Sequence, residues 1–171
     1  MEARLRYRDP NVIHHLCTID PGKRACGVAM WRVDDGERSL EWAGLVSQRD
    51  GNATKLARKI LNLKDKIGGV FVFYVEDPQF YALKRTAHRD LGSLKKVIAV
   101  LEASGARPMT KVKPVQWKGN LPKSVHHERV KKHLEPEELK LVPKDHNVLD
   151  AVALGLFVLG RTDKGAMVPK G

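Results

Sequence analysis

The most constraining feature of this chain is a run of β-branched and aromatic residues, 70–76 (VFVFYVE), that ends in a single acid, Glu76. A continuous apolar run of this length is typical of a strand covered on both faces. We therefore expect an open sheet with this strand near its middle and helices on either side. A carboxylate at the end of such a strand is costly unless it is paired or bound to a cation, which makes Glu76 a candidate functional residue.

Turn and cap signals divide the rest of the chain into further elements. The expected strands cover residues 15–20, 25–33, 40–47, 70–76 and 106–113, with a hairpin turn at 34–36. The expected helices cover residues 53–67 (capped by Asn52 and Gly68), about 83–104, 124–133, 136–141 and 146–159. This order predicts an α/β fold with a mixed five-stranded sheet, in which a three-strand meander precedes helix-linked strands, flanked by helices.

A length of 171 residues suits one domain. We expect an N-terminal arm over residues 1–12, a single domain over 13–161 and a flexible tail over 162–171. No apolar run approaches the ~20 residues that span a bilayer, and the first residues are charged, so we expect no membrane partner and a cytoplasmic location. Cys17 and Cys26 lie in strand-like sequence without zinc-site spacing, which predicts two buried free thiols.

The chain is strongly basic, with 31 Lys and Arg against 20 Asp and Glu and a formal net charge of +11. Such a balance favours a polyanionic partner, with nucleic acid ahead of an anionic membrane surface. No basic amphipathic helix of the lipid-binding kind is evident, so nucleic acid is the favoured partner.

Two further acids stand where a fold normally has apolar residues. Asp20 ends the first strand directly before Pro21-Gly22, and Asp150 precedes the apolar run 151–159. Taken singly, Asp20 could simply begin a turn and Asp150 could face solvent. In an open sheet, however, the ends of the first and fourth strands can lie side by side, and a helix crossing that edge can add a third carboxylate. The sequence therefore predicts that Asp20, Glu76 and Asp150 meet.

Converging carboxylates repel one another and are stable together when a divalent cation binds them. Hard oxygen ligands select Mg²⁺ or Mn²⁺. Two such ions about 3.5–4 Å apart stabilise the attacking and leaving oxygens of an in-line phosphoryl displacement. In a basic protein, these residues predict a metal-dependent nuclease.

Four segments resemble motifs of the RuvC-type Holliday junction resolvases, in the form that phages encode. They are residues 19–22 with Gly27, residues 75–80 (VEDPQF), Val112-x-Pro114-x-x-Trp117-Lys118 with Lys123, and residues 150–154 (DAVAL). The motifs occur in family order and span most of the chain. One of them alone would be weak, since an IDPG turn can also open an actin-like ATPase.

The resemblance implies a ribonuclease-H-like fold, a homodimer and a crossover junction endodeoxyribonuclease that places paired symmetric nicks in a four-way DNA junction. It carries metal binding onto Asp20, Glu76 and Asp150, with two Mg²⁺ ions per active site, for which Mn²⁺ can substitute. We expect Asp20 to bridge the ions and Glu76 and Asp150 each to help hold one. If phage-encoded, the protein would act in the host cytoplasm.

The family usually carries a fourth acidic or His residue three positions before the last Asp, where this chain has Asn147. His146 and Asp145 are the candidate substitutes. Asp145 is equally suited to cap the last helix. We favour His146 as a fourth catalytic residue, acting as a ligand or a proton carrier.

The resemblance also indicates DNA contacts. An aromatic residue after the second acid can stack on an unpaired base, a role that Phe80 or its neighbour Tyr81 can fill, although Phe80 could equally pack under its loop. The basic residues expected to contact phosphates are Lys84, Arg85, Lys118 and Lys123.

Other functions remain open from the sequence. Asn147 favours a catalytically inactive, nucleic-acid-binding protein of the same fold. A ribonuclease-H-like enzyme acting on hybrids or flaps is a second alternative. An actin-like phosphotransferase is a third, but it would need a second glycine-rich phosphate loop and a longer chain.

Overall fold

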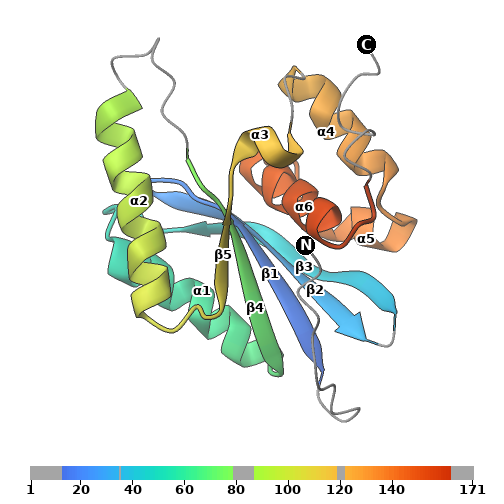
Figure 1. The fold of residues 1–171 in the computed structure, drawn as a ribbon, viewed down its shortest axis with the longest axis horizontal. Helices are drawn as coiled ribbons and strands as arrows, with labels where there is room; N and C mark the ends of the chain where they lie inside the picture. The colour runs from blue at the N-terminus through green and yellow to red at the C-terminus, as the bar shows by residue number, and fades with distance from the viewer. Residues whose placement is uncertain (1–12, 35, 79–86, 119–121, 163–171) are drawn as a thin grey trace.

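Figure 1 shows the chain as a computed structural model, which describes residues 13–34, 36–78, 87–118 and 122–162. The expected arm 1–12 and most of the expected tail lie outside these residues. The strands are β1 (His14–Asp20), β2 (Ala25–Asp34), β3 (Glu37–Ser47), β4 (Val70–Glu76) and β5 (Met109–Val112). The helices are α1 (Ala53–Ile67), α2 (Ala87–Ala103), α3 (Pro114–Trp117), α4 (Lys123–Lys132), α5 (Pro136–Leu141) and α6 (His146–Val158).

The strands form one five-stranded sheet in the order β3-β2-β1-β4-β5. β1, β2 and β3 make an antiparallel meander, whereas β4 pairs with β1 and β5 in parallel. The expected mixed sheet is therefore confirmed. In the parallel pair Ile19 lies opposite Val75, so the carboxyl ends of β1 and β4 reach the same edge of the sheet.

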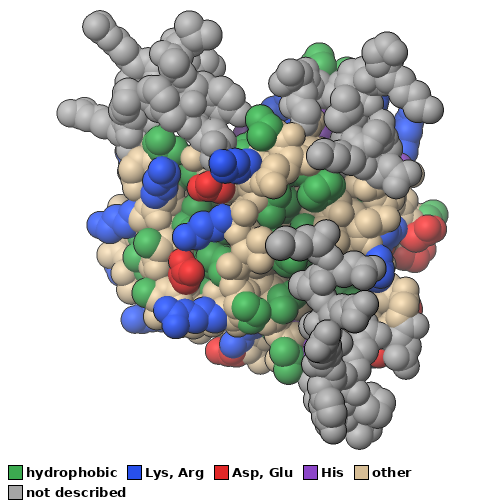
Figure 2. Space-filling model, viewed as in Figure 1, with side chains coloured by type: hydrophobic (Ala, Val, Ile, Leu, Met, Phe, Trp, Pro, Cys, Tyr) green, Lys and Arg blue, Asp and Glu red, His purple; other side chains and the backbone are tan. Residues whose placement is uncertain are grey.

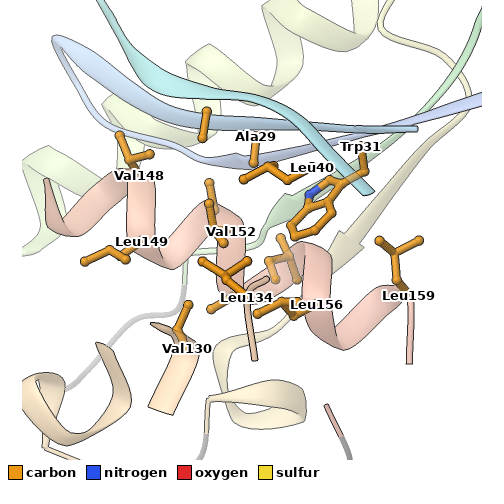
Figure 3. Close-up of a cluster of buried hydrophobic side chains, with 14 of the residues drawn as sticks. Ala29, Trp31, Leu40, Val130, Leu134, Val148, Leu149, Val152, Leu156 and Leu159 are labelled. Atoms are coloured by element: carbon orange, nitrogen blue, oxygen red, sulfur yellow. The ribbon is translucent and has the colours of Figure 1, made fainter. Parts of the chain in front are cut away.

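Helices cover both faces of the sheet (Figure 1). α1 and α2 pack on one face, where they enclose a core with Cys17, Ile19 and Phe73. α6 covers the opposite face and is itself covered by α4 and α5. In Figure 3, α6 lies between the sheet residues Ala29, Trp31 and Leu40 and the outer residues Val130 and Leu134. α6 is therefore buried from both sides, which explains why its sequence is almost wholly apolar.

Most local expectations are confirmed. The Asn52 side chain caps α1 by accepting a hydrogen bond from the Lys55 amide, and Gly68 ends the helix with a positive φ of 77°. Cys17 and Cys26 are free and buried.

Some expectations differ from the structure. The expected strand 40–47 begins earlier, at Glu37, and the short helix α3 was not expected. β4 is fully buried on the α1/α2 face only, because Val72 and Tyr74 on the α6 face remain partly accessible. β5 is shorter than the expected 106–113, because residues 106–108 form the turn that leaves α2. There the Ala106 amide donates to the Leu101 carbonyl.

Within the described residues, no helix has the combination of length and apolar character needed to cross a bilayer.

A buried ion pair ties the C-terminal end of α6 to α5 and β3. Arg161 Nη1 and Nη2 lie 2.6 and 2.8 Å from the two carboxylate oxygens of Glu138, which also accepts a hydrogen bond from the Leu40 amide. The Arg161 Nη2 also donates to the His133 carbonyl. Removing one partner of such a pair leaves an uncompensated buried charge.

We therefore expect Arg161→Met to lower the free energy of unfolding by about 3 kcal/mol in urea denaturation. The exposed pair of Lys140 and Glu137 supplies a control, since Lys140→Met should change stability little. Equal stability of the two variants would contradict a structural role for the buried pair.

Candidate active site

Three acids converge where β1 and β4 end. Asp20 is the last residue of β1 and Glu76 the last of β4, on neighbouring parallel strands. Because side chains alternate along a strand, Asp20 lies on the same face as Thr18, and Glu76 on the same face as Tyr74. This is the face that α6 covers. The two acids predicted from strand ends are therefore adjacent and directed towards α6.

α6 supplies Asp150, which is only 3% exposed. The helix is fixed to the sheet by the Thr18 hydroxyl, which donates a 2.7 Å hydrogen bond to the Ala151 carbonyl. Gly27, the residue paired with Asp20, lies against the backbone of Asn147 and Val148 at the start of α6. A glycine here allows the helix to approach the sheet closely enough to deliver Asp150 beside the strand ends.

A Cβ at Gly27 would overlap the Asn147 backbone. We expect Gly27→Ala to displace the first turn of α6 and to cost about 1–3 kcal/mol of stability, as overpacking typically does. Gly92→Ala is the matched control, because a Cβ there meets no atom of the described residues within 4 Å. In the exposed middle of α2 it should stabilise the protein by about 0.5–1 kcal/mol. Chemical denaturation of both variants measures these effects. A Gly27→Ala variant as stable as the wild type would show that the close approach is not required.

Basic side chains lie among the acids. The Lys118 ammonium, at the end of α3, is 2.8 Å from Asp150 Oδ2 and 3.5 Å from Glu76 Oε2. Lys123, the first residue of α4, lies 3.8 Å from Asp150 Oδ2. The motif lysines, which we expected to contact phosphates, thus lie directly at the carboxylates.

The charges of these groups are strongly coupled. Burial, together with the negative charges of Glu76 and Asp150, raises the pKa of Asp20 well above its usual range. Burial also raises the pKa of Glu76, although Lys118 partly offsets the rise. Burial would raise the pKa of Asp150 as well, but Lys118 and the hydrogen bond from His127 lower it overall. Negative charge at Asp20 and Glu76 is therefore only partly compensated by the side chains around it.

Two histidines of α4 were missed in the sequence. His127 Nε2 lies 3.0 Å from Asp150 Oδ1, and His126, which is fully buried, lies 3.8 Å from the same oxygen. Burial lowers the pKa of His126 to about 4, so its ring is neutral near pH 7. The only signal in the sequence was a pair of adjacent histidines in a basic helix, and nothing there indicated that this helix packs against α6.

The donor set fits a hard divalent cation. Carboxylate oxygens are the ligands that Mg²⁺ prefers, and within the described residues the buried Glu76 Oε2 has only the Lys118 ammonium near it, at 3.5 Å. Among the residues that the structure describes, no three His, Cys, Asp or Glu side chains are arranged to hold an ion as they stand. Lys118 contacts both Glu76 and Asp150, so an ion bound between these two acids requires the Lys118 ammonium to move.

Of the other predicted site residues, the structure describes Asp145 and His146, and neither contacts the three acids through a hydrogen bond or ion pair among the described residues. Asp145 caps α6, where its side chain accepts hydrogen bonds from the amides of Asn147 and Val148. His146 is exposed and lines a hollow between α4 and α6; within the described residues, no hydrogen bond or ion pair links it to the three acids. The expected DNA contacts Phe80, Tyr81, Lys84 and Arg85 lie outside the described residues.

Basic side chains also occur away from the acids. Figure 2 shows Lys and Arg side chains interspersed with carboxylates on one face of the molecule. Some of this charge is already paired, as between Lys111 of β5 and Glu102 of α2, 3.2 Å apart. The net positive charge is therefore not concentrated at the acids alone.

Comparison with solved structures identifies the fold. RuvC of T. thermophilus in complex with a Holliday junction substrate matches with a TM-score of 0.61 at 19% identity, over 83% of this chain and 90% of that one. A second Thermus thermophilus RuvC structure gives a TM-score of 0.57 at 19% identity, over 86% and 97%. The yeast mitochondrial Holliday junction resolvase Ydc2 gives 0.51 at 12% identity, over 89% and 81%. No protein-family model matches the sequence, and no curated protein matches it significantly. The chain thus has the ribonuclease-H-like fold of these resolvases, as the motifs predicted.

Proposed function

We propose that this chain is a structure-selective DNA endonuclease that resolves four-way junctions by metal-ion-dependent hydrolysis of phosphodiester bonds. The observation that carries the proposal is the convergence of Asp20, Glu76 and Asp150 at one sheet edge. The fold adds support, because a RuvC with the same fold has been solved with a Holliday junction substrate. The net charge of +11 suits a nucleic-acid substrate.

Each residue at the site has a role in this proposal. Asp20, Glu76 and Asp150 would hold Mg²⁺ or Mn²⁺. The bound ions supply positive charge that stabilises the negative charge developing on the phosphate. His127 positions Asp150 through its hydrogen bond. Lys118 and Lys123 exchange their carboxylate partners for phosphate oxygens of the DNA when substrate binds.

The finer features are part of the same proposal. Two ions per site and a homodimer that makes paired symmetric nicks follow the expectation from the motifs, since a four-way junction has two-fold symmetry. Phe80 or Tyr81 would act at the junction centre, and Lys84 and Arg85 would contact its phosphates.

The test is cleavage of a synthetic four-way junction whose arms carry different fluorophores. We expect symmetric nicks with Mg²⁺ and none with EDTA. Linear duplex, flap and RNA–DNA hybrid serve as competitors at fixed salt, because binding of basic proteins to any nucleic acid depends on salt. Preferential cleavage of hybrid or flap would contradict junction resolution while leaving a nuclease.

Two observations favour a second candidate, an inactive nucleic-acid-binding protein. Lys118 pairs with both Glu76 and Asp150, and Asn147 stands where the motif has an acid or His. Under this alternative the protein would bind junctions but leave them intact with Mg²⁺ and with Mn²⁺. The cleavage assay therefore separates the two candidates.

A further inference from the structure

A hollow of about 370 Å³ lies between α4, the segment joining α5 to α6, and the first turns of α6. His127 lines this hollow and also contacts Asp150, with its Nε2 3.0 Å from Asp150 Oδ1. One imidazole therefore separates the hollow from the candidate catalytic carboxylate. A group bound in the hollow would lie next to whatever is bound at Asp150.

The wall of the hollow combines two kinds of surface. Leu149, Leu139 and Val142 supply apolar area, and Leu139 remains 41% exposed. The side chains of Lys131, Lys144, His127 and His146 also line it, together with one acid, Glu128. That acid is paired with Lys131, whose ammonium lies 2.7 Å from Glu128 Oε1. The hollow therefore has an apolar surface with an excess of positive charge.

This combination matches one ligand chemistry better than others. A nucleotide presents a flat base that buries well against apolar side chains and a phosphate that attracts cations. A purely apolar peptide segment would make no use of the lysines, and an anion alone would make no use of the leucines. Charge complementarity and proximity to Asp150 thus favour a nucleotide of the substrate.

We propose that this hollow binds an unpaired nucleotide of the DNA strand next to the phosphate that is cut. This inference rests on the proposed nuclease function and adds to it a binding site for one nucleotide of the substrate. Leu139 and Leu149 contact the base, and Lys131 and Lys144 attract the flanking phosphates. His146 hydrogen-bonds to the base edge. The assignment gives His146, which lies apart from the acids, a role in substrate binding rather than in proton transfer.

The test uses the full chain and four-way junctions that carry 4-thiothymidine at single positions around the expected cut. Photo-crosslinking is done in EDTA, so that binding is read without cleavage. We expect crosslinks from the nucleotide beside the cut phosphate to residues 124–131 or 139–149. Crosslinks from that nucleotide that map only outside these two segments would overturn the proposal.

A matched pair of variants provides a second readout. Leu139→Glu and Leu141→Glu place the same charge on the same short helix, at residues that are 41% and 43% exposed, but Leu141 does not line the hollow. Leu139→Glu should weaken junction binding about tenfold, the loss of affinity expected when about 1.4 kcal/mol of apolar burial against one base is removed, while Leu141→Glu should bind like the wild type. Equal affinity of the two variants would overturn the proposal.

Cleavage by the wild type with Mg²⁺ is measured separately. A wild type that crosslinks through the hollow but never cuts would refute the nuclease function and leave the hollow as a nucleotide site. A wild type that cuts junctions but crosslinks elsewhere would refute the hollow alone.

Discussion

Asp20→Asn should abolish junction cleavage while leaving a folded protein that still binds junctions. The negative charges of both Glu76 and Asp150 act on Asp20 and raise its pKa. An amide cannot supply the negative charge that holds a cation. Losing several kcal/mol of charge stabilisation in the transition state corresponds to a rate at least about a thousandfold lower. Single-turnover cleavage with Mg²⁺ measures the rate, and gel-shift binding in EDTA measures affinity.

Asp20→Asn should also change how the stability of the protein responds to Mg²⁺. A carboxyl whose pKa is raised in the folded state destabilises that state at pH values above its ordinary pKa, because the ionised form is penalised by burial and repulsion. We therefore expect Asp20→Asn to be at least as stable as the wild type in EDTA at pH 7, and to lose the increase in Tm that Mg²⁺ gives the wild type. Substantial Mg²⁺-dependent cleavage by this variant would reject Asp20 as a metal ligand.

Lys118→Met should produce the largest loss of stability among the site variants. Among the described residues, Lys118 is the cation closest to two largely buried acids, Asp150 at 4% and Glu76 at 14% side-chain exposure. Removing it leaves their charges poorly compensated, a change that costs about 3–5 kcal/mol when one partner of a buried pair is lost. Urea denaturation in EDTA at pH 7 measures this loss. Lys96→Met, at an exposed position of α2, is the control and should change stability little.

Two conditions should restore stability to Lys118→Met. Lys118 lowers the pKa of both Glu76 and Asp150, so without it these carboxyls take up protons more readily in the folded state. The stability deficit relative to wild type should therefore shrink as the pH falls from 7 towards 5. Saturating Mg²⁺ should also reduce the deficit, because an ion that binds only the folded state stabilises it. A deficit that neither lower pH nor Mg²⁺ changes would mean that Lys118 stabilises by packing alone.

Much of the site could be predicted because its acids interrupt apolar sequence. Glu76 ends a strand that is otherwise β-branched and aromatic, and Asp150 lies within a helix that is buried from both sides. Because an acid at a buried position is costly, a functional role is the simplest explanation for Glu76 and Asp150. Asp20 alone could be an ordinary turn residue. The expected pairing of the parallel strand ends is what placed it beside Glu76.

The remaining parts of the site depend on packing that local sequence does not encode. α4 has the composition of a solvent-exposed basic helix, yet its contact with α6 brings His126 and His127 to Asp150. His146 shares a helical face with Asp150 by spacing, but it precedes the buried turns of α6 and remains exposed. The sequence suits Asp145 to capping or to catalysis alike, and the hydrogen bonds that its side chain accepts show that it caps α6.

The central claim is that Asp20, Glu76 and Asp150 form one cation-binding site. The most direct measurement is a crystal structure of the protein soaked in Mn²⁺, with the ion located by anomalous scattering. We expect one or two anomalous peaks that together contact all three carboxylates, with the Lys118 ammonium displaced from Glu76 and Asp150. A saturating soak with no peak there, or with Mn²⁺ bound only elsewhere, would contradict the account.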